Sequence, residues 1–206
     1  MELCSREDAY VVDLDRPACR VGCIIMASGL GKRFCGNKLM ADFHGKPMIL
    51  RAIEASEAFA SHRVVVTRHP EVADLCRELG VQVILHDQPH RSDTIRLGLE
   101  ALADVDGCFF LPGDQPLLRR ETMEAMVSQW EKDQESIQRP VHRETPGAPI
   151  LFPRWTFPEL LTLPEGKGGG WLLPKYPEHV KGFEVDDPFQ LMDVDTPETL
   201  RFLEEK

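Results

Sequence analysis

The chain has 206 residues, of which 42% are hydrophobic and 28% are charged, and this balance is ordinary for one soluble globular domain. Its formal net charge is −10, so we expect neither a nucleic acid nor an anionic membrane as a partner. The six cysteines match no CxxC pair, zinc motif or disulfide framework, which favours a reducing, cytoplasmic setting.

The apolar pattern predicts an α/β protein with a mainly parallel sheet. Residues 1–20 are predicted to form a polar N-terminal extension, and the domain begins at Val21. From there, apolar runs of strand length alternate with segments of helical pattern, which is typical of β-α-β units. The predicted strands are 21–27, 62–67, 81–85 and 107–111, and the predicted helices are 47–59, 70–79, 92–102 and 120–132.

The last third of the chain has a looser pattern, because prolines interrupt each short apolar run after about residue 135. This part is predicted to be irregular. A final strand is predicted over 189–194, followed by a closing helix over 199–205. That strand would carry Asp193 and Asp195 to the edge of the sheet.

The first predicted strand runs into a loop of glycines and positive charge, in CIIMASGLGKRFCGNKLM (residues 23–40). No Gly-Lys pair is followed by Ser or Thr, which excludes a P-loop, and Phe34 replaces the third glycine of a dinucleotide-binding turn. Backbone amides together with Lys32, Arg33 and Lys38 would instead hold the triphosphate of a nucleotide. The alternative for this stretch alone is a solvated surface loop.

A second feature is CFFLPGDQPLL (residues 108–118), where an apolar strand ends and presents Asp114. Ligands of open α/β sheets lie beyond the carboxyl ends of the strands. Mg²⁺ prefers one or two carboxylates together with phosphate oxygens, and Asp114 with Asp193 or Asp195 could supply them. The alternatives are local roles, an Asx turn at Asp114 and a helix cap at Asp195. Together, the cationic loop and the carboxylates predict nucleotidyl transfer with Mg²⁺.

The same motifs resemble a known family. MASGLGKRFCGNKL resembles the signature loop of nucleotidyltransferases with a GT-A-like Rossmann domain. LPGDQPLL, PGAPILFP, LPEGKGGGWLL and FEVDDPFQLMDVDTPETL follow in the order found in the molybdenum cofactor cytidylyltransferases. The resemblance covers Val21 to Leu203. It implies a single nucleotidyltransferase domain over 21–206, with a three-layer αβα Rossmann-like (GT-A-type) architecture.

The resemblance also implies an activity and the residues that carry it. The activity is an Mg²⁺-dependent transfer of CMP from CTP, or from another NTP, to molybdopterin cofactor, with release of pyrophosphate. It would serve the maturation of molybdenum hydroxylases, which would be transient partners. The implied site comprises Ala27, Ser28 and Gly29 along the base and ribose, Gly31, Arg33 and Lys38 on the triphosphate, Ser92 on the nucleotide, and Asp114, Asp195 and Asp193 on the metal. Arg33, Lys38 and Asp114 would be the catalytic residues, and a helix N-cap is the alternative role for Ser92.

Three departures from the family pattern leave alternatives open. Cys35 replaces a glycine of the loop, and Ser28 occupies a position that helps family members to choose between CTP and GTP. The glycine run at 166–171 lacks the acid and the arginine of the family segment, so the acceptor could differ. The alternatives are a nucleotidyltransferase for a sugar phosphate or alcohol phosphate, and a carrier of nucleotide or molybdenum cofactor without turnover.

Overall fold

The computed structural model describes residues 19–206 apart from 32, 35 and 103. The predicted extension over 1–20 therefore lies almost wholly outside the described residues. The main sheet has the strand order β10 (Val180–Glu184), β7 (Ile137–His142), β9 (Ile150–Pro153), β6 (Gly107–Pro112), β1 (Val21–Ala27), β4 (Arg63–Thr67) and β5 (Val83–Leu85), with β8 (Thr145–Pro146) paired to β7. A small hairpin is formed by β2 (Asp42–Phe43) and β3 (Lys46–Pro47).

The predicted mainly parallel sheet is confirmed. Strand β1 pairs in parallel with β4 and β6, and β4 pairs in parallel with β5. These four strands are the four that the sequence predicted. Strand β10 is parallel to β7, whereas β9 is antiparallel to both of its neighbours, β6 and β7. The antiparallel strand separates the sheet into two parallel parts.

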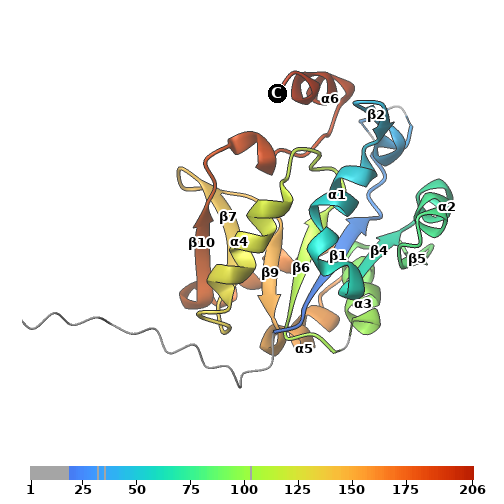
Figure 1. Ribbon diagram of the computed structural model, residues 1–206. Coiled ribbons are helices and arrows are strands. Elements are labelled where there is room, and N and C mark those ends of the chain that lie inside the picture. The colour runs from blue at the N-terminus through green and yellow to red at the C-terminus, as the bar shows by residue number, and fades with distance from the viewer. Residues whose placement is uncertain (1–18, 32, 35, 103) are drawn as a thin grey trace, which may run out of the picture.

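Helices cover both faces of the sheet, which confirms the three-layer αβα architecture (Figure 1). Helices α1 (Ile49–Ala55), α2 (Pro70–Glu78) and α4 (Arg120–Trp130) pack on one face, and α3 (Arg91–Ala101) and α5 (Phe157–Leu161) pack on the other. Helix α6 (Pro197–Glu204) closes the chain, with its first turn capped by the Thr196 side chain, which accepts a hydrogen bond from Thr199 N.

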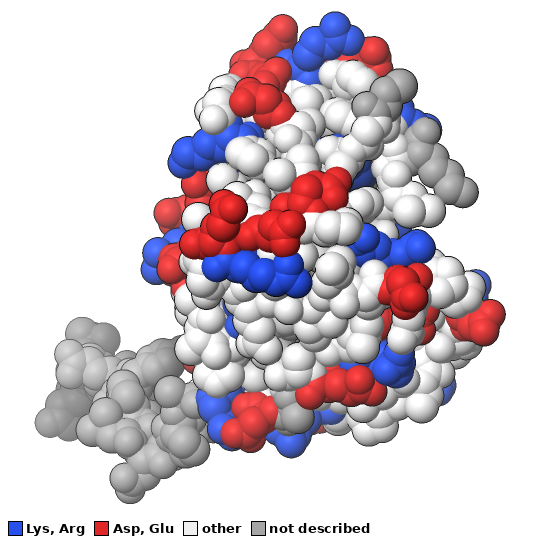
Figure 2. Space-filling model, turned by 90° about the vertical axis from the view of Figure 1, so that its right-hand side faces the viewer, with Lys and Arg blue, Asp and Glu red and all other residues white. Residues whose placement is uncertain are grey.

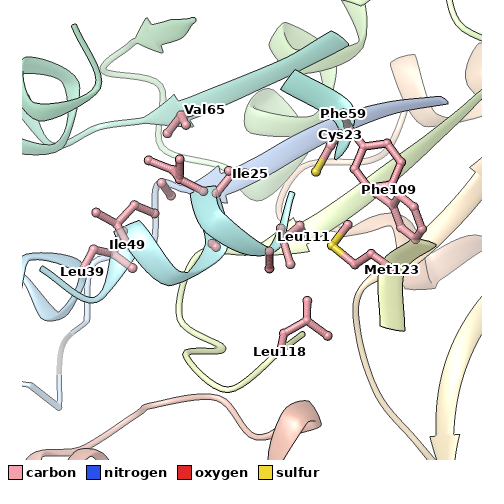
Figure 3. Close-up of a cluster of buried hydrophobic side chains, with 14 of the residues drawn as sticks. Cys23, Ile25, Leu39, Ile49, Phe59, Val65, Phe109, Leu111, Leu118 and Met123 are labelled. Atoms are coloured by element: carbon pink, nitrogen blue, oxygen red, sulfur yellow. The ribbon is translucent and has the colours of Figure 1, made fainter. Parts of the chain in front are cut away.

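Alternate residues of the central strands face the two helical layers. Cys23 and Ile25 of β1 lie in the core beneath α1 and α4, whereas Ile24 lies in the core beneath α3. Figure 3 shows the first core, in which Ile25, Leu111 and Phe109 of the strands meet Ile49 and Met123 of the helices. Because both faces are buried, these strands are nearly continuous apolar runs, and this is why the sequence revealed them.

Two predictions for the last third of the chain were wrong. The region after residue 135 contains β7, β9 and β10 rather than irregular chain. The predicted strand over 189–194 is absent, because Pro188–Leu191 form a 3-10 helix that the Asp187 side chain caps at Phe189 N. Residues 192–195 then pass beside the end of β6, where Val194 N–H donates to Asp114 O at 2.9 Å.

Among the described residues, no helix combines the length and the apolar character that crossing a membrane requires. The face shown in Figure 2 carries acidic and basic side chains interspersed with uncharged ones, and its described residues form no continuous basic surface there.

Gly98 of α3 supplies a test of this packing. A Cβ atom there would lie 2.7 Å from Ile24 Cγ2 and 2.8 Å from Cδ1. Replacing glycine by alanine favours a helix by about 1 kcal/mol, but overpacking a core costs about 1–3 kcal/mol. We expect Gly98→Ala to lower the free energy of unfolding by about 1 kcal/mol in urea titrations. In an Ile24→Ala background the same change should be stabilising, and an effect of the same sign in both backgrounds would contradict this packing.

Candidate active site

A cavity of about 780 Å³ opens at the carboxyl ends of the parallel strands. It is reached from the ends of β1, β4 and β6, through Gly29, Arg68 and Asp114 respectively. This is the place where open α/β sheets bind ligands. The cavity therefore brings together the glycine loop and the acidic segments that lie far apart in the sequence.

The start of the loop is fastened to β4 and to the residues that follow it. The Ala27 carbonyl accepts a hydrogen bond from Thr67 Oγ1, and the Gly29 carbonyl accepts one from His69 Nε2, both at 2.9 Å. The chain then turns at Gly31, which has φ +54, a conformation that favours glycine. As a result, the backbone of the loop is held at the mouth of the cavity.

Lys38 is the centre of the polar network in this cavity. It opens a short 3-10 helix, Lys38–Met40, and is only 8% exposed. Its Nζ donates to Asp114 Oδ2 at 2.5 Å, to the Val194 carbonyl at 2.9 Å and to Asp195 Oδ1 at 3.4 Å. All three protons of the ammonium group thus have acceptors. The lysine joins the loop, the end of β6 and the segment before α6.

Arg33 and Asp193 extend this network. Arg33 Nη2 donates to Asp195 Oδ2 at 2.8 Å across the exposed side of the cavity. Asp193 also lines the cavity. Asp193 retains exposure to solvent. The pKa of its carboxyl is nevertheless raised from 3.8 to about 6, chiefly by partial burial and then by the negative charge of Asp114. Three carboxylates face two paired cations, so this part of the cavity attracts a further positive charge.

The carboxylates fit a metal ion that arrives with a nucleotide. No group of three His, Cys, Asp or Glu side chains is arranged to hold an ion by itself within the described ranges. Mg²⁺, however, commonly takes one or two carboxylates and completes its coordination with phosphate oxygens and water. Asp114 and Asp195, which share the Lys38 ammonium group, match this pattern of donors.

Ser28 has partners that the sequence motifs did not indicate. Its hydroxyl donates to the Val66 carbonyl at 3.1 Å and lies 2.9 Å from His86 Nε2. A hydroxyl has a single proton, so His86 Nε2 is then the donor to Ser28. Burial lowers the pKa of His86, which keeps this ring neutral at neutral pH. His86 follows β5 and belongs to no recognisable motif, and only the packing of β4 against β5 places it here.

The structure brings most of the predicted site residues to the cavity. Those that line it are Ser28, Gly29, Gly31, Arg33, Lys38, Asp114, Asp193 and Asp195. Ala27 and Ser92 are buried and are not among the lining residues. Lys32, like Cys35, lies outside the described residues. Ser92 is the second residue of α3, so it is not the N-cap; the cap is His90, whose N–H donates to Asp93 Oδ2. The contact between Ser92 and a nucleotide stays a prediction.

The other wall of the cavity was largely missed by sequence reasoning. It is formed by apolar side chains of β6 and β9, by the start of α3 and by the glycine run. These residues are His90, Arg91, Thr94, Phe110, Ile150, Phe152 and Gly168–Gly170. The quoted motifs contain the glycine run, Phe110, Ile150 and Phe152, but only the packing of β9 and α3 beside β6 shows that these residues share one wall with His90, Arg91 and Thr94.

Residues 23–180 match the sequence model of a family described as the MobA-like NTP transferase domain. A curated relative, the 3-deoxy-manno-octulosonate cytidylyltransferase of Neisseria meningitidis serogroup C, is 34% identical over 97 residues. That match covers 42% of this chain and 36% of the relative, so the chain aligns with about a third of the relative's length.

Solved structures share the fold over nearly the whole chain. Rv0371c of Mycobacterium tuberculosis H37Rv in complex with manganese has a TM-score of 0.74 and 20% identity, covering 91% of this chain and 99% of that one. The molybdopterin-guanine dinucleotide biosynthesis protein A of Archaeoglobus fulgidus has a TM-score of 0.70 and 21% identity, covering 89% and 97%. At these identities the likeness establishes the GT-A-type nucleotidyltransferase fold.

Removing the Lys38 ammonium group should destabilise the protein. We expect Lys38→Met to lower the free energy of unfolding by about 2 kcal/mol or more in urea titrations, because Asp114, Asp195 and the Val194 carbonyl lose their donor. The matched control is Lys46→Met, which removes an exposed pair with Glu54 and should cost about 0.5 kcal/mol or less. Equal costs for the two variants would show that the network adds no stability.

The raised pKa of Asp193 predicts a pH dependence of stability. Because the carboxyl titrates at about 6 in the folded protein and at 3.8 ordinarily, the folded state binds the proton more tightly, and the wild type loses stability as pH rises through this range. We expect metal-free Asp193→Asn to have a higher Tm than the wild type at about pH 8 and an equal Tm near pH 4. The control Asp74→Asn, on the surface of α2, should show no such pH-dependent difference in Tm from the wild type.

Proposed function

This chain belongs to the family of MobA-like NTP transferase domains, and we propose from this that it transfers a nucleoside monophosphate from an NTP to a phosphate acceptor. The observation that carries the proposal is the Lys38 network. One buried ammonium group joins the glycine loop to Asp114 and Asp195 at the carboxyl ends of the strands. Cations and carboxylates that lie this close together support the binding of a triphosphate with a divalent ion.

In the proposed reaction, an oxygen of the acceptor phosphate attacks the α-phosphorus of the NTP. The bond from that phosphorus to the β-phosphate oxygen breaks, and pyrophosphate leaves with the electron pair. Arg33 would bind the triphosphate oxygens, and Lys38 would do so in exchange for one of its carboxylate contacts, so that both stabilise the charge that develops on the leaving group. Asp114 and Asp195 would hold the divalent ion, and Mg²⁺ would supply neutralisation of the phosphate charge at this site.

The chemistry requires no nucleophile from the protein. The acceptor phosphate is itself a competent nucleophile, so positioning and charge neutralisation supply the catalysis. The described cysteines of the core agree with this view, because burial raises the pKa of Cys23 to about 12 and that of Cys76 to about 11. These thiols are packing residues.

We propose CTP as the donor. Relatives from Neisseria meningitidis, Serratia proteamaculans and Chlorobium phaeobacteroides that match part of the chain are cytidylyltransferases by name. Ser28 adds a physical argument, because its hydroxyl donates to the Val66 carbonyl and accepts from His86, which leaves a lone pair for an incoming donor. The amino group of cytosine is such a donor, whereas uracil presents a carbonyl at the same position.

Molybdopterin is the proposed acceptor, and a molybdenum hydroxylase would receive the product. The order of the motifs and the description of the matched family support this choice. Ile150, which lines the cavity and is partly exposed, adds an apolar contact that suits a ring system. A sugar derivative is the second candidate, supported by the 34% identity to a cytidylyltransferase for a sugar acid.

Pyrophosphate release from CTP, GTP, ATP and UTP, each with Mg²⁺ and molybdopterin, tests the function. We expect release with CTP, and we expect Asp114→Asn to slow it by about a hundredfold or more, because the metal loses a ligand. The control Asp186→Asn changes an exposed carboxylate that does not line the cavity and should keep full activity. Release only with a sugar acceptor would favour the second candidate. Binding of CTP and molybdopterin without release from any NTP would favour a carrier.

A further inference from the structure

The cations of the cavity fall into two groups. Four lysine or arginine side chains line it among the described residues, and two of them, Arg33 and Lys38, are paired with carboxylates. The other two, Arg68 and Arg91, have no hydrogen bond or ion pair with any side chain that the structure describes. The cavity thus holds two arginines that have no carboxylate partner among the described residues.

Arg91 is placed by the glycine run. It is the first residue of α3, and its side chain lies across Gly168. A Cβ atom at Gly168 would come within 2.9 Å of Arg91 Cδ and 3.6 Å of Arg91 Nη1. A larger residue at position 168 would displace the arginine, so the glycine makes room for the guanidinium group beside the backbone of Gly168–Gly170.

Thr94 lies one helical turn after Arg91 and gives an independent indication of a ligand. The residue lines the cavity and is 1% exposed. Its Oγ1 is buried and has no hydrogen-bond partner within the described part of the chain. A buried hydroxyl without a partner is costly, and a bound polar group would remove that cost.

We propose that Arg91, together with Thr94 and the Gly168–Gly170 backbone, binds the phosphate group of the acceptor. This inference rests on the proposed function and assigns its second anion site. The triphosphate engages Arg33 and Lys38, beside three carboxylates that repel a further anion. An unpaired guanidinium group on the opposite wall attracts the acceptor phosphate and can donate two parallel hydrogen bonds to it.

The first experiment measures binding of methyl phosphate by phosphorus NMR, with and without Mg²⁺ and a non-hydrolysable CTP analogue. The analogue keeps the probe out of the triphosphate site, and the probe needs neither turnover nor the correct acceptor. We expect Arg91→Gln to weaken the binding by about ten- to a hundredfold, the size of a charge-assisted contact, and Arg91→Lys to weaken it less. The matched control, Arg120→Gln, alters an exposed arginine of α4 on the other face of the sheet and should leave the binding unchanged.

The second readout separates this inference from the proposed function. In the pyrophosphate assay, Arg91→Gln should raise the KM for the acceptor about tenfold or more while kcat and the KM for CTP stay close to wild type. A rise in the KM for CTP alone, or methyl phosphate binding that is equal in Arg91→Gln and wild type, would overturn the role of Arg91. So would the absence of methyl phosphate binding to the wild type. Failure of the CTP analogue to bind would count against the proposed donor, and the comparison of variants without analogue would still decide the role of Arg91.

Discussion

The ion pair between Lys38 and Asp114 is the interaction on which the rest of the site depends. A lysine ammonium group this far from solvent is costly unless every proton has an acceptor, and here a carboxylate and a carbonyl lie within 2.9 Å and a second carboxylate at 3.4 Å. To meet this requirement, the loop after β1, the end of β6 and the segment before α6 must converge on one point. The same convergence places cations beside carboxylates. Cations bind the oxygens of a nucleoside triphosphate, and carboxylates bind the divalent ion that accompanies it.

Much of the parallel part of the fold could be predicted from the sequence, because its strands are buried on both faces. Strands such as β1 and β6 are apolar at each position and are followed by polar, glycine-containing turns. Since the carboxyl ends of parallel strands lie at one edge, the order of the elements also predicted that the glycine loop and Asp114 would meet. The pairing of Lys38 with Asp195 could not be derived this way, because it depends on a segment of irregular backbone.

The remaining elements were hidden by local chemistry. Pro140 lies within β7 and Pro153 ends β9, and in a sequence both read as signals against a strand. Tertiary pairing overrides this, since the Pro140 carbonyl accepts from Gly147 N while β10 pairs alongside. His86, Arg91 and Thr94 belong to no motif. The positions of these side chains depend on how α3 and β5 pack against the sheet. No short sequence pattern indicates that packing.

The completion of the Lys38 network by residues 194 and 195 has a consequence for biosynthesis. Lys38 and Asp195 are 157 positions apart, so Asp195 leaves the ribosome long after the glycine loop does. A nascent chain that has already formed the β1–β4–β6 sheet therefore still lacks two of the acceptors for its buried ammonium group. A chain truncated before residue 193 carries the glycine loop without Asp193 and Asp195. The Lys38 network is therefore completed only after residues 194 and 195 have been synthesised and lie beside the end of β6.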